Sequence, residues 1–283
     1  MAIERVGVIG AGAMGSGIVE VVAKAGVEVV ARDISAEAVE AGLGRVVASL
    51  DKAVDRGKLA AADRDAAAGR IEWTTELDDL AGCDLVIEAA VEQLDLKRSI
   101  FAELDTVLGA DAVMATNTSS IPVVDIAMAT SRPERVLGLH FFNPAPVMRL
   151  VEIIATERTD PSVTDAVTTF ASDVLDKRVV PSRDRAGFVV NALLVPYICQ
   201  AIAMLDAGHA TAVDIDEAMV LGASHPMGPL ALADLIGLDV CLAVAESLHE
   251  EYAERLYAPP PLLRRMVAAG HLGRKTGKGF HDY

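Results

Sequence analysis

A histidine and a glutamate in two neighbouring apolar segments suggest acid–base chemistry. His140 lies near the end of one strand-like run, GLHFF, and Glu152 interrupts the next run, RLVEII. A carboxylate buried in a strand is costly unless a partner compensates its charge, and the simplest partner for Glu152 is His140. A carboxylate that bonds one ring nitrogen fixes the tautomer and leaves the other nitrogen as a general base. We predict that His140 is this base and that Glu152 orients it, the alternative being a purely structural pair.

Other polar residues stand where a ligand could contact them. The segment ATNTSSIP ends an apolar strand in hydroxyl and amide groups, among them Asn117 and Ser119. In an open parallel sheet the ligand crevice lies at the carboxyl ends of the strands, so both are well placed. Asn191 is a lone amide in the apolar segment FVVNALLVPY, and the alternative for it is a core amide bonded to backbone. The remaining histidines show no comparable partner and are predicted to be surface or structural residues: His209, His225, His249, His271 and His281.

A glycine-rich loop near the start of the chain predicts a dinucleotide site. The segment VIGAGAMGSG follows a strand-like run and opens a helix. Its glycines allow a tight turn, close approach of the backbone to a pyrophosphate, and close packing of helix on strand. The N–H groups of the helix N-terminus then face the phosphates. The predicted cofactor-binding residues of this loop are Gly10, Gly12, Ala13, Met14 and Gly15.

An acidic residue after the next strand indicates which dinucleotide binds. The run VEVVARD ends at Asp33, about 20 residues beyond the loop, where a carboxylate suits the ribose 2′-hydroxyl of NAD. Asp33 disfavours a 2′-phosphate, but Arg32 beside it leaves some use of NADP open. A nicotinamide site combined with a general base predicts hydride transfer between NAD and a carbinol carbon.

A cationic stripe lies on the long helix predicted for residues 35–59. Arg45, Ser49, Lys52 and Arg56 fall at helical spacing and therefore share one face. In a chain of net charge -16, such a stripe beside a dinucleotide site is either an ordinary solvated face or the binding site of a phosphate-bearing substrate. We call these four residues the cationic stripe. The opposite, apolar face is predicted to comprise Val39, Leu43, Val46, Leu50 and Val54.

The order of strand-like and helix-like segments predicts two domains. Up to about residue 180, runs such as RVGVIG, DLVIEA and AVMATNT alternate with helical patterns, which is typical of a parallel sheet covered on both faces. Beyond residue 187 all patterns are helical, including the uncharged stretch 186–205 and a continuous segment at 229–252. We predict an α/β fold: an N-terminal Rossmann-like domain with a mostly parallel sheet at 1–184, and an all-helical C-terminal domain at 185–283.

Bulk composition restricts the function further. The chain has 283 residues, 52% of them hydrophobic, and its negative charge disfavours nucleic acid and anionic lipid as partners. The uncharged stretch 186–205 is interpreted as a buried helix, because it contains polar residues and no second span resembles it. We expect a cytoplasmic protein without a signal peptide, a membrane segment or a metal site. Its reduced thiols are Cys83, Cys199 and Cys241.

The motifs together resemble a known enzyme family. The segments GAGAMGSGI, NTSSIP, GLHFFNPAPVMRLVEII, GFVVNALLVPY, HPMGPLALADLIGLD and GRKTGKGF occur in this order. They are similar to those of the L-3-hydroxyacyl-CoA dehydrogenases, and most of all to the short bacterial 3-hydroxybutyryl-CoA dehydrogenases. The resemblance runs from Ile3 to the C-terminus and implies reversible, NAD-dependent oxidation of (S)-3-hydroxyacyl-CoA, with 3-hydroxybutyryl-CoA as the expected substrate, in fatty-acid or butyrate metabolism.

The resemblance also implies roles for individual residues. His140 would take the proton of the 3-hydroxyl group, Glu152 would orient it, and hydride would pass from C3 to the nicotinamide. Ser119 and Asn191 would bind the substrate oxygen and help to position the thioester. The helical domain would form a homodimer. Further cofactor contacts would be Glu92, Lys97, Asn117, Asn143 and Lys275, and the CoA part would meet Ser49, Lys52 and Arg56 on the cationic stripe.

Two other functions fit part of the pattern. The λ-crystallin branch of the family, which resembles L-gulonate dehydrogenase, shares the dinucleotide motif and the His–Glu pair. A sugar acid, however, needs no cationic stripe. A non-catalytic NAD-binding or structural protein is the second alternative, and the intact set Ser119, His140, Glu152 and Asn191 argues against it.

Overall fold

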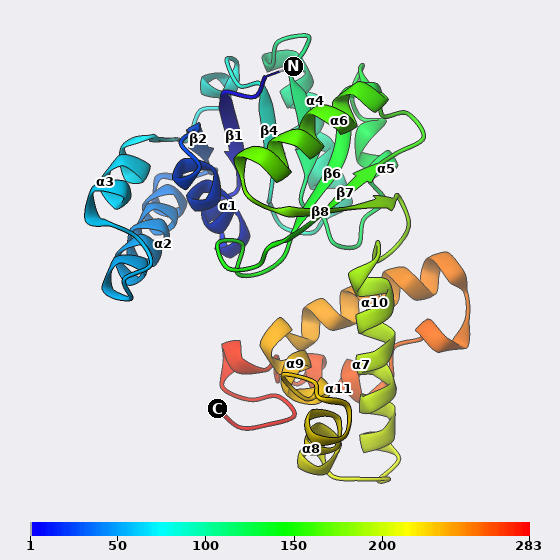
Figure 1. Cartoon of the computed structure of the whole chain (residues 1–283). Coiled ribbons are helices and arrows are strands. Elements are labelled where there is room, and N and C mark those ends of the chain that lie inside the picture. The colour runs from blue at the N-terminus through cyan, green and yellow to red at the C-terminus, as the bar shows by residue number, and fades with distance from the viewer. Residues whose placement is uncertain (1) are drawn as a thin grey trace. The chain divides into compact units, whose positions relative to one another are not determined.

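The computed structural model describes residues 2–283. They form two compact units, one extending to Arg185 and the other spanning Ala186–Tyr283. Figure 1 shows strands and helices in the first unit and helices in the second. The predicted fold class, a Rossmann-like α/β unit followed by a helical one, is confirmed.

A single sheet of eight strands within residues 2–283 forms the centre of the first unit. Its order is β3-β2-β1-β4-β5-β6-β7-β8, and every neighbouring pair is parallel except β6 with β7. The antiparallel pair arises because the connection 142–149 is too short for a crossover. The strand order reverses between β1 and β4, where ligands of such sheets bind. The strands are β1 Arg5–Ile9, β2 Glu28–Arg32, β3 Ile71–Thr74, β4 Leu85–Glu88, β5 Val113–Thr116, β6 Val136–Phe141, β7 Leu150–Ala155 and β8 Arg178–Arg183.

Helices cover both faces of the sheet. Apolar residues of α1 (Ala13–Lys24), α2 (Ala36–Asp55) and α6 (Pro161–Thr169) share one core cluster with alternate residues of the strands. The buried residues of α4 (Leu94–Val107) and α5 (Val123–Ala127) lie outside that cluster and cover the opposite face. The helix α3 (Ala61–Gly69) packs beside α1 and α2 (Figure 1).

The pleat of β6 and β7 explains why a histidine and a carboxylate occur in core strands. Leu139 and Ile153 belong to the cluster beneath α1, so their strand neighbours point to the other face. His140 and Glu152 are direct partners in the antiparallel register and therefore lie side by side on that second face. The second face of this strand pair thus places His140 and Glu152 beside each other next to apolar residues such as Ile154.

The helix that carries the cationic stripe begins as predicted but is rotated from expectation. The Ser35 hydroxyl caps α2 by accepting from the backbone N–H of Ala38. A Cβ added to Gly42 would lie 2.5 Å from the Ala11 Cβ, so α2 approaches the glycine loop at this glycine. The prediction that Leu43 faces the core is wrong, since its side chain is 43% exposed. The close approach at Gly42 turns the next residue outward.

The second unit is a helical bundle with its own apolar core. The segment predicted as one helix over 229–252 is two helices, because Gly237 interrupts it with φ of 106°. Among residues 2–283, none of the helices combines the length and the hydropathy that crossing a bilayer requires. The helices are α7 Val190–Asp206, α8 Ala212–Ala223, α9 Pro229–Ile236, α10 Leu238–Tyr252 and α11 Pro261–Ala268.

Two buried carboxylates hold the C-terminal residues against this bundle. Asp234 accepts from the backbone N–H groups of Phe280 and His281. Asp216 accepts from the N–H of Leu230 at 2.8 Å and lies 2.8 Å from Nε2 of His281. The expectation that His281 lacks a carboxylate partner is therefore wrong. Its partner is distant in the sequence, so spacing alone could not reveal it.

Candidate active site

Ser119, His140 and Glu152 form a hydrogen-bonded row that runs from the turn after β5 across β6 and β7. The Ser119 Oγ lies 3.0 Å from His140 Nε2, and His140 Nδ1 lies 2.8 Å from Glu152 Oε2. His140 is 3% exposed and Glu152 is 0% exposed, so little water competes for these bonds. We call these three residues the polar row. The structure pairs His140 with Glu152 as the sequence predicted, and it places Ser119 at the other ring nitrogen, a contact that was not predicted.

The row sets the protonation pattern of the imidazole. A carboxylate is an acceptor only, so Glu152 receives the Nδ1–H of His140. In the neutral ring Nε2 is then the basic nitrogen, and the Ser119 hydroxyl donates to it. If Nε2 takes a proton, the Glu152 carboxylate stabilises the resulting imidazolium. This arrangement can accept a proton from a hydroxyl group placed near Nε2 and Ser119 Oγ.

A buried ion pair lies beside the row at the end of β4. Lys97 Nζ is 2.7 Å from Glu88 Oε1, with the two side chains 1% and 0% exposed. The Thr116 hydroxyl donates to Glu88 Oε2 at 2.7 Å, and Thr116 ends β5. Lys97 Nζ also lies 3.4 Å from Glu92 Oε2. The ion pair therefore joins α4 to the ends of β4 and β5.

Glu92 connects this ion pair to the polar row. Its Oε1 accepts from the Thr118 hydroxyl at 2.6 Å and from the backbone N–H groups of Ser119 and Ser120 at 2.8 and 3.0 Å. Burial raises the pKa of Glu92, but the Lys97 cation and these hydrogen bonds outweigh it, and the pKa is lowered below its ordinary value. An ionised Glu92 thus holds the turn that presents the Ser119 hydroxyl to His140. Lys97 was predicted as a cofactor contact. In the structure its ammonium group instead contacts Glu88, Glu92 and the carbonyl of Ala90.

The glycine loop fits a dinucleotide pyrophosphate. A Cβ at Gly15 would lie 1.6 Å from the Gly10 carbonyl oxygen, so close packing of α1 on β1 requires glycine there. Gly10 has φ of +93°, a conformation that favours glycine. A Cβ at Gly12 would meet no atom within 4 Å, so nothing within residues 2–283 explains this glycine. The open space above Gly12, at the N-terminus of α1, is where a pyrophosphate would approach.

The peptide of Ala11 is held from both sides. Asp33 Oδ2 accepts the Ala11 N–H at 2.6 Å, which places the carboxylate beside the loop, where the ribose of NAD is expected. On the other side, Arg45 Nη2 donates to the Ala11 carbonyl at 2.8 Å, and the Ser16 hydroxyl donates to the same oxygen at 2.7 Å. Arg32, which left NADP use open, donates through Nε to the Thr75 carbonyl at 3.2 Å.

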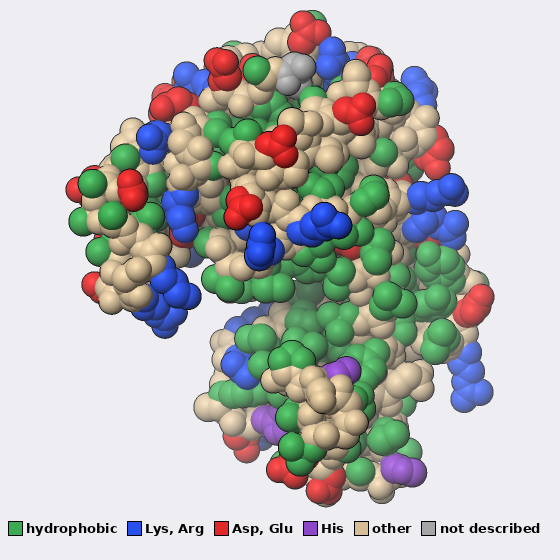
Figure 2. Space-filling model, viewed as in Figure 1, with side chains coloured by type: hydrophobic (Ala, Val, Ile, Leu, Met, Phe, Trp, Pro, Cys, Tyr) green, Lys and Arg blue, Asp and Glu red, His purple; other side chains and the backbone are tan. Residues whose placement is uncertain are grey.

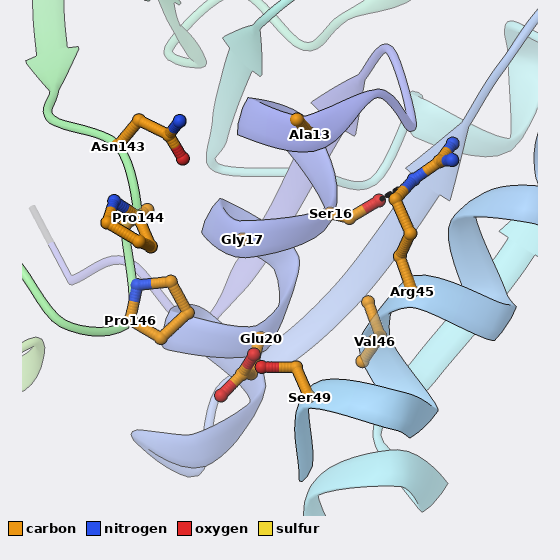
Figure 3. A pocket seen from close by; sticks show the side chains of 11 residues that line it. Ala13, Ser16, Gly17, Glu20, Arg45, Val46, Ser49, Asn143, Pro144 and Pro146 are labelled. Carbon is orange, nitrogen blue, oxygen red and sulfur yellow. Dashed lines mark hydrogen bonds between the residues drawn. The ribbon is translucent and has the colours of Figure 1, made fainter. Parts of the chain in front are cut away.

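A cavity of about 190 Å³ joins predicted cofactor residues to part of the cationic stripe. Ala13 and Asn143 line it together with Ser49 and the buried Glu20 (Figure 3). The ammonium of the buried Lys177 holds the loop on one side of it, donating to the carbonyls of Ala145 and Met148. Burial and the nearby Lys24 cation lower the pKa of Lys177.

The other predicted residues lie apart from these clusters or are held differently. The Asn117 Oδ1 accepts the Phe141 N–H at 2.8 Å, which ties the end of β5 to β6. Lys52 and Arg56 are exposed, and Figure 2 shows basic side chains gathered at this end of α2. Asn191 lies half-buried at the start of α7, in the second unit. Lys275 also belongs to the second unit, and its Nζ is 2.6 Å from both carboxylate oxygens of Asp239.

Glu88 and Lys177 were not predicted from the sequence. Glu88 ends the run DLVIEA as an isolated acid in a core strand, which is the same signal that drew attention to Glu152. It could have been found by asking for its partner. Lys177 stands in a polar segment, DKRVV, and its sequence shows no sign that it is buried.

Comparison with known proteins assigns the family. Residues 5–185 match the model of the 3-hydroxyacyl-CoA dehydrogenase NAD binding domain, and residues 187–283 match that of the 3-hydroxyacyl-CoA dehydrogenase C-terminal domain. The chain belongs to the 3-hydroxyacyl-CoA dehydrogenase family. Members of this family are NAD-dependent oxidoreductases, and the glycine loop and Asp33 belong to the matched NAD-binding domain.

Relatives of the family match over their whole length. The 3-hydroxybutyryl-CoA dehydrogenase of Mycobacterium tuberculosis is 55% identical over 283 residues, covering 100% of this chain and 99% of the relative. The crystal structure of M. tuberculosis FadB2 superposes with a TM-score of 0.99 at 55% identity and 100% coverage of both chains. The structure of (S)-3-hydroxybutyryl-CoA dehydrogenase from Ralstonia eutropha gives a TM-score of 0.95 at 47% identity, covering 100% of this chain and 99% of that one.

Proposed function

We propose that this protein oxidises (S)-3-hydroxyacyl-CoA thioesters to 3-oxoacyl-CoA with NAD, reversibly, and that 3-hydroxybutyryl-CoA is its substrate. The observation that carries the proposal is the polar row, in which a buried His140 is bonded to Glu152 on one nitrogen and to Ser119 on the other. A base of this kind is required to remove the proton of a secondary hydroxyl group as hydride leaves the same carbon.

The residues of the row divide the work at the carbinol. His140 Nε2 takes the hydroxyl proton, and the charge that forms is stabilised by Glu152. The Ser119 hydroxyl, 3.0 Å from Nε2, is placed to bond the same substrate oxygen. NAD bound at the glycine loop would supply the acceptor for the hydride of C3, so that the alcohol would become a ketone as two electrons leave the substrate. We assign Asn191 a second contact to the thioester or its 3-oxygen, on the family resemblance alone.

The CoA part is proposed to lie along the cationic stripe. Ser49 lines the cavity that also contains Asn143, and Lys52 and Arg56 extend the basic surface beyond it. CoA carries several phosphate charges, so a basic surface on a chain of net charge -16 favours its binding. A free short-chain acid offers no such charges and would gain nothing from these residues.

Loss of NADH absorbance tests the function directly. Purified protein and NADH are mixed with acetoacetyl-CoA, with free acetoacetate in a parallel reaction. Rapid oxidation with the thioester alone is expected, since only the thioester reaches the stripe. Absence of oxidation with acetoacetyl-CoA, while NADH still binds, would contradict the proposal. Rapid reduction of NAD to NADH with L-gulonate as the substrate would favour the sugar-acid alternative.

The proposal also covers the oligomeric state and the cellular location of the protein. We propose a homodimer through the helical unit, supported by apolar side chains exposed on its helices, such as Leu193 at 73% and Leu221 at 80%. Sedimentation at micromolar concentration tests this, and a monomer would refute it. We also propose a cytoplasmic location, supported by three buried cysteines without a disulfide.

A further inference from the structure

Arg45 differs from the rest of the cationic stripe because it is bonded to the glycine loop. Its Nη2 donates to the Ala11 carbonyl oxygen at 2.8 Å, and its Nε lies 3.3 Å from the same oxygen. Nε is also 3.4 Å from the Ser16 hydroxyl oxygen, and a dashed line in Figure 3 marks this contact. The fork of the guanidinium thus closes on one backbone carbonyl.

That carbonyl belongs to the peptide whose N–H is at Gly12. In a trans peptide the C=O and the following N–H point in opposite directions. A donor that fixes the Ala11 carbonyl therefore fixes the Gly12 N–H toward the other side. No partner for this N–H is found among residues 2–283, and a Cβ at Gly12 would meet open space. The donor faces the region where the pyrophosphate approaches.

Asp33 completes the restraint on the same residue. Its carboxylate accepts the Ala11 N–H at 2.6 Å, while Arg45 and Ser16 donate to the Ala11 carbonyl. Both polar groups of Ala11 are therefore bonded to side chains. These bonds restrain the loop in the conformation observed, and a restrained loop loses less entropy on binding.

We propose that Arg45 is a positioning residue of the cofactor loop: it holds the Ala11–Gly12 peptide so that its N–H faces the NAD pyrophosphate, and it governs affinity for NAD(H) instead of for the acyl-CoA. Its cation adds a favourable charge near the two phosphates. The cationic stripe then has two functions, with Arg45 serving the cofactor and Lys52 and Arg56 serving the substrate. The role of Arg45 in binding NAD(H) rests on the family assignment. Only the statement that Arg45 does not govern the affinity for acyl-CoA rests on the proposed function.

Direct binding of NADH, measured by its fluorescence without acyl-CoA, tests the role of Arg45 in binding NAD(H). Arg45→Met is expected to raise the NADH dissociation constant about tenfold, the value of one charged hydrogen bond. Lys52→Met is the matched control, since it removes a cation from the same helix, and NADH affinity should be unchanged. Equal weakening by both variants would overturn the proposal, because it would show a general charge effect. Unchanged affinity in Arg45→Met would also overturn it.

Fragments and conservative variants separate positioning from folding or bare charge. ADP-ribose contains the pyrophosphate and AMP does not, so Arg45→Met should weaken ADP-ribose strongly and AMP little. Arg45→Lys keeps the charge but loses the fork, and intermediate NADH affinity is expected. Wild-type affinity in Arg45→Lys, or equal losses for ADP-ribose and AMP, would refute positioning. Ser16→Ala, which removes the other donor to Ala11, should weaken NADH in the same direction.

The steady-state constants test the statement that Arg45 does not govern the affinity for acyl-CoA. In Arg45→Met the KM for NADH should rise while the KM for acetoacetyl-CoA and kcat stay unchanged. A rise confined to the KM for acetoacetyl-CoA would return Arg45 to the substrate and overturn the inference. If no variant, wild type included, turns over acetoacetyl-CoA, the proposed function fails while the NADH binding results still decide the role of Arg45.

Discussion

The polar row and the cationic stripe represent two ways of building a binding or reacting site. In the row, strand register places His140 opposite Glu152, both are buried, and each ring nitrogen of His140 lies against a side-chain oxygen. On the stripe, Lys52 lies on α2 and Arg56 directly follows the end of that helix, and both are exposed. Buried partners in a low-dielectric surrounding interact strongly, whereas exposed charges are screened by water and salt. Substitutions in the row should therefore reduce enzyme activity much more than substitutions on the stripe.

The largest expected effect is at the centre of the row. His140→Ala should lower kcat roughly 10²–10⁴-fold, the usual contribution of a general base. NADH affinity should be nearly unchanged, since no loop contact is lost. His271→Ala, a histidine outside the row, serves as the control and should retain full turnover. A parallel loss of NADH binding in His140→Ala would count against the role of His140 as the base.

Next in size is the buried ion pair beside the row. Lys97→Met should destabilise the fold by about 3–5 kcal/mol, because it leaves Glu88 buried without its cation. Chemical denaturation measures this. Arg265→Met removes an exposed arginine whose Nη2 lies 2.9 Å from Asp206 Oδ1, and should cost less than about 1 kcal/mol. Equal losses for the two variants would show that burial does not distinguish these pairs.

The charge on Glu152 has a smaller effect than the imidazole itself. In Glu152→Gln a neutral acceptor replaces the carboxylate at His140 Nδ1. Turnover should fall about tenfold, since a hydrogen bond to a charged group is worth about 1–2 kcal/mol more than a neutral one. Stopped-flow measurement of NADH oxidation would detect this. Full activity in Glu152→Gln would remove the dyad from the mechanism.

Disruption of the stripe should change binding only. The double variant Lys52→Met, Arg56→Met should raise the KM for acetoacetyl-CoA by about tenfold at low salt, with kcat unchanged, since each exposed contact is worth at most about 1 kcal/mol. The effect should shrink as ionic strength rises. Arg64→Met is the control, because its guanidinium is already bonded to Asp51 and Asp65. A fall in kcat would mean that the stripe takes part in more than substrate binding.

The smallest effect concerns acid stability. The lowered pKa of Glu92 means that its ionised form stabilises the folded state above the ordinary value of 4.5, and that this stabilisation is lost as pH falls through the lower, folded-state pKa. Glu92→Gln should therefore flatten the decline of stability below about pH 4.5. Urea titrations at several pH values would reveal it. An unchanged slope would indicate that Glu92 does not titrate differently in the folded protein.

Sequence patterns of short range predicted much of this molecule. The glycine loop and the alternation of strands and helices depend on residues close together in the chain, so local spacing carries the information. The partnership of His140 and Glu152 was also accessible, because a lone carboxylate in a core strand demands a partner nearby.

Other features depended on contacts between distant segments. Two contacts join residues on different elements: the ion pair of Glu88 and Lys97, and the bond between Asp216 and His281. The periodicity of the sequence predicts neither of them. The rotation of α2 that exposes Leu43 follows from a close contact of Gly42 with the loop, which helical spacing does not contain.

The sequence by itself determined the alternation of strands and helices, the pairing of His140 with Glu152 and the family resemblance, because each follows from local spacing and composition. Only the tertiary structure decided what Arg45 does. On the helix it belongs to the cationic stripe, but its guanidinium is bonded to the carbonyl of Ala11, which lies far away in the chain. A side chain's partner depends on how helices and loops pack, and helical periodicity describes only which residues share a face.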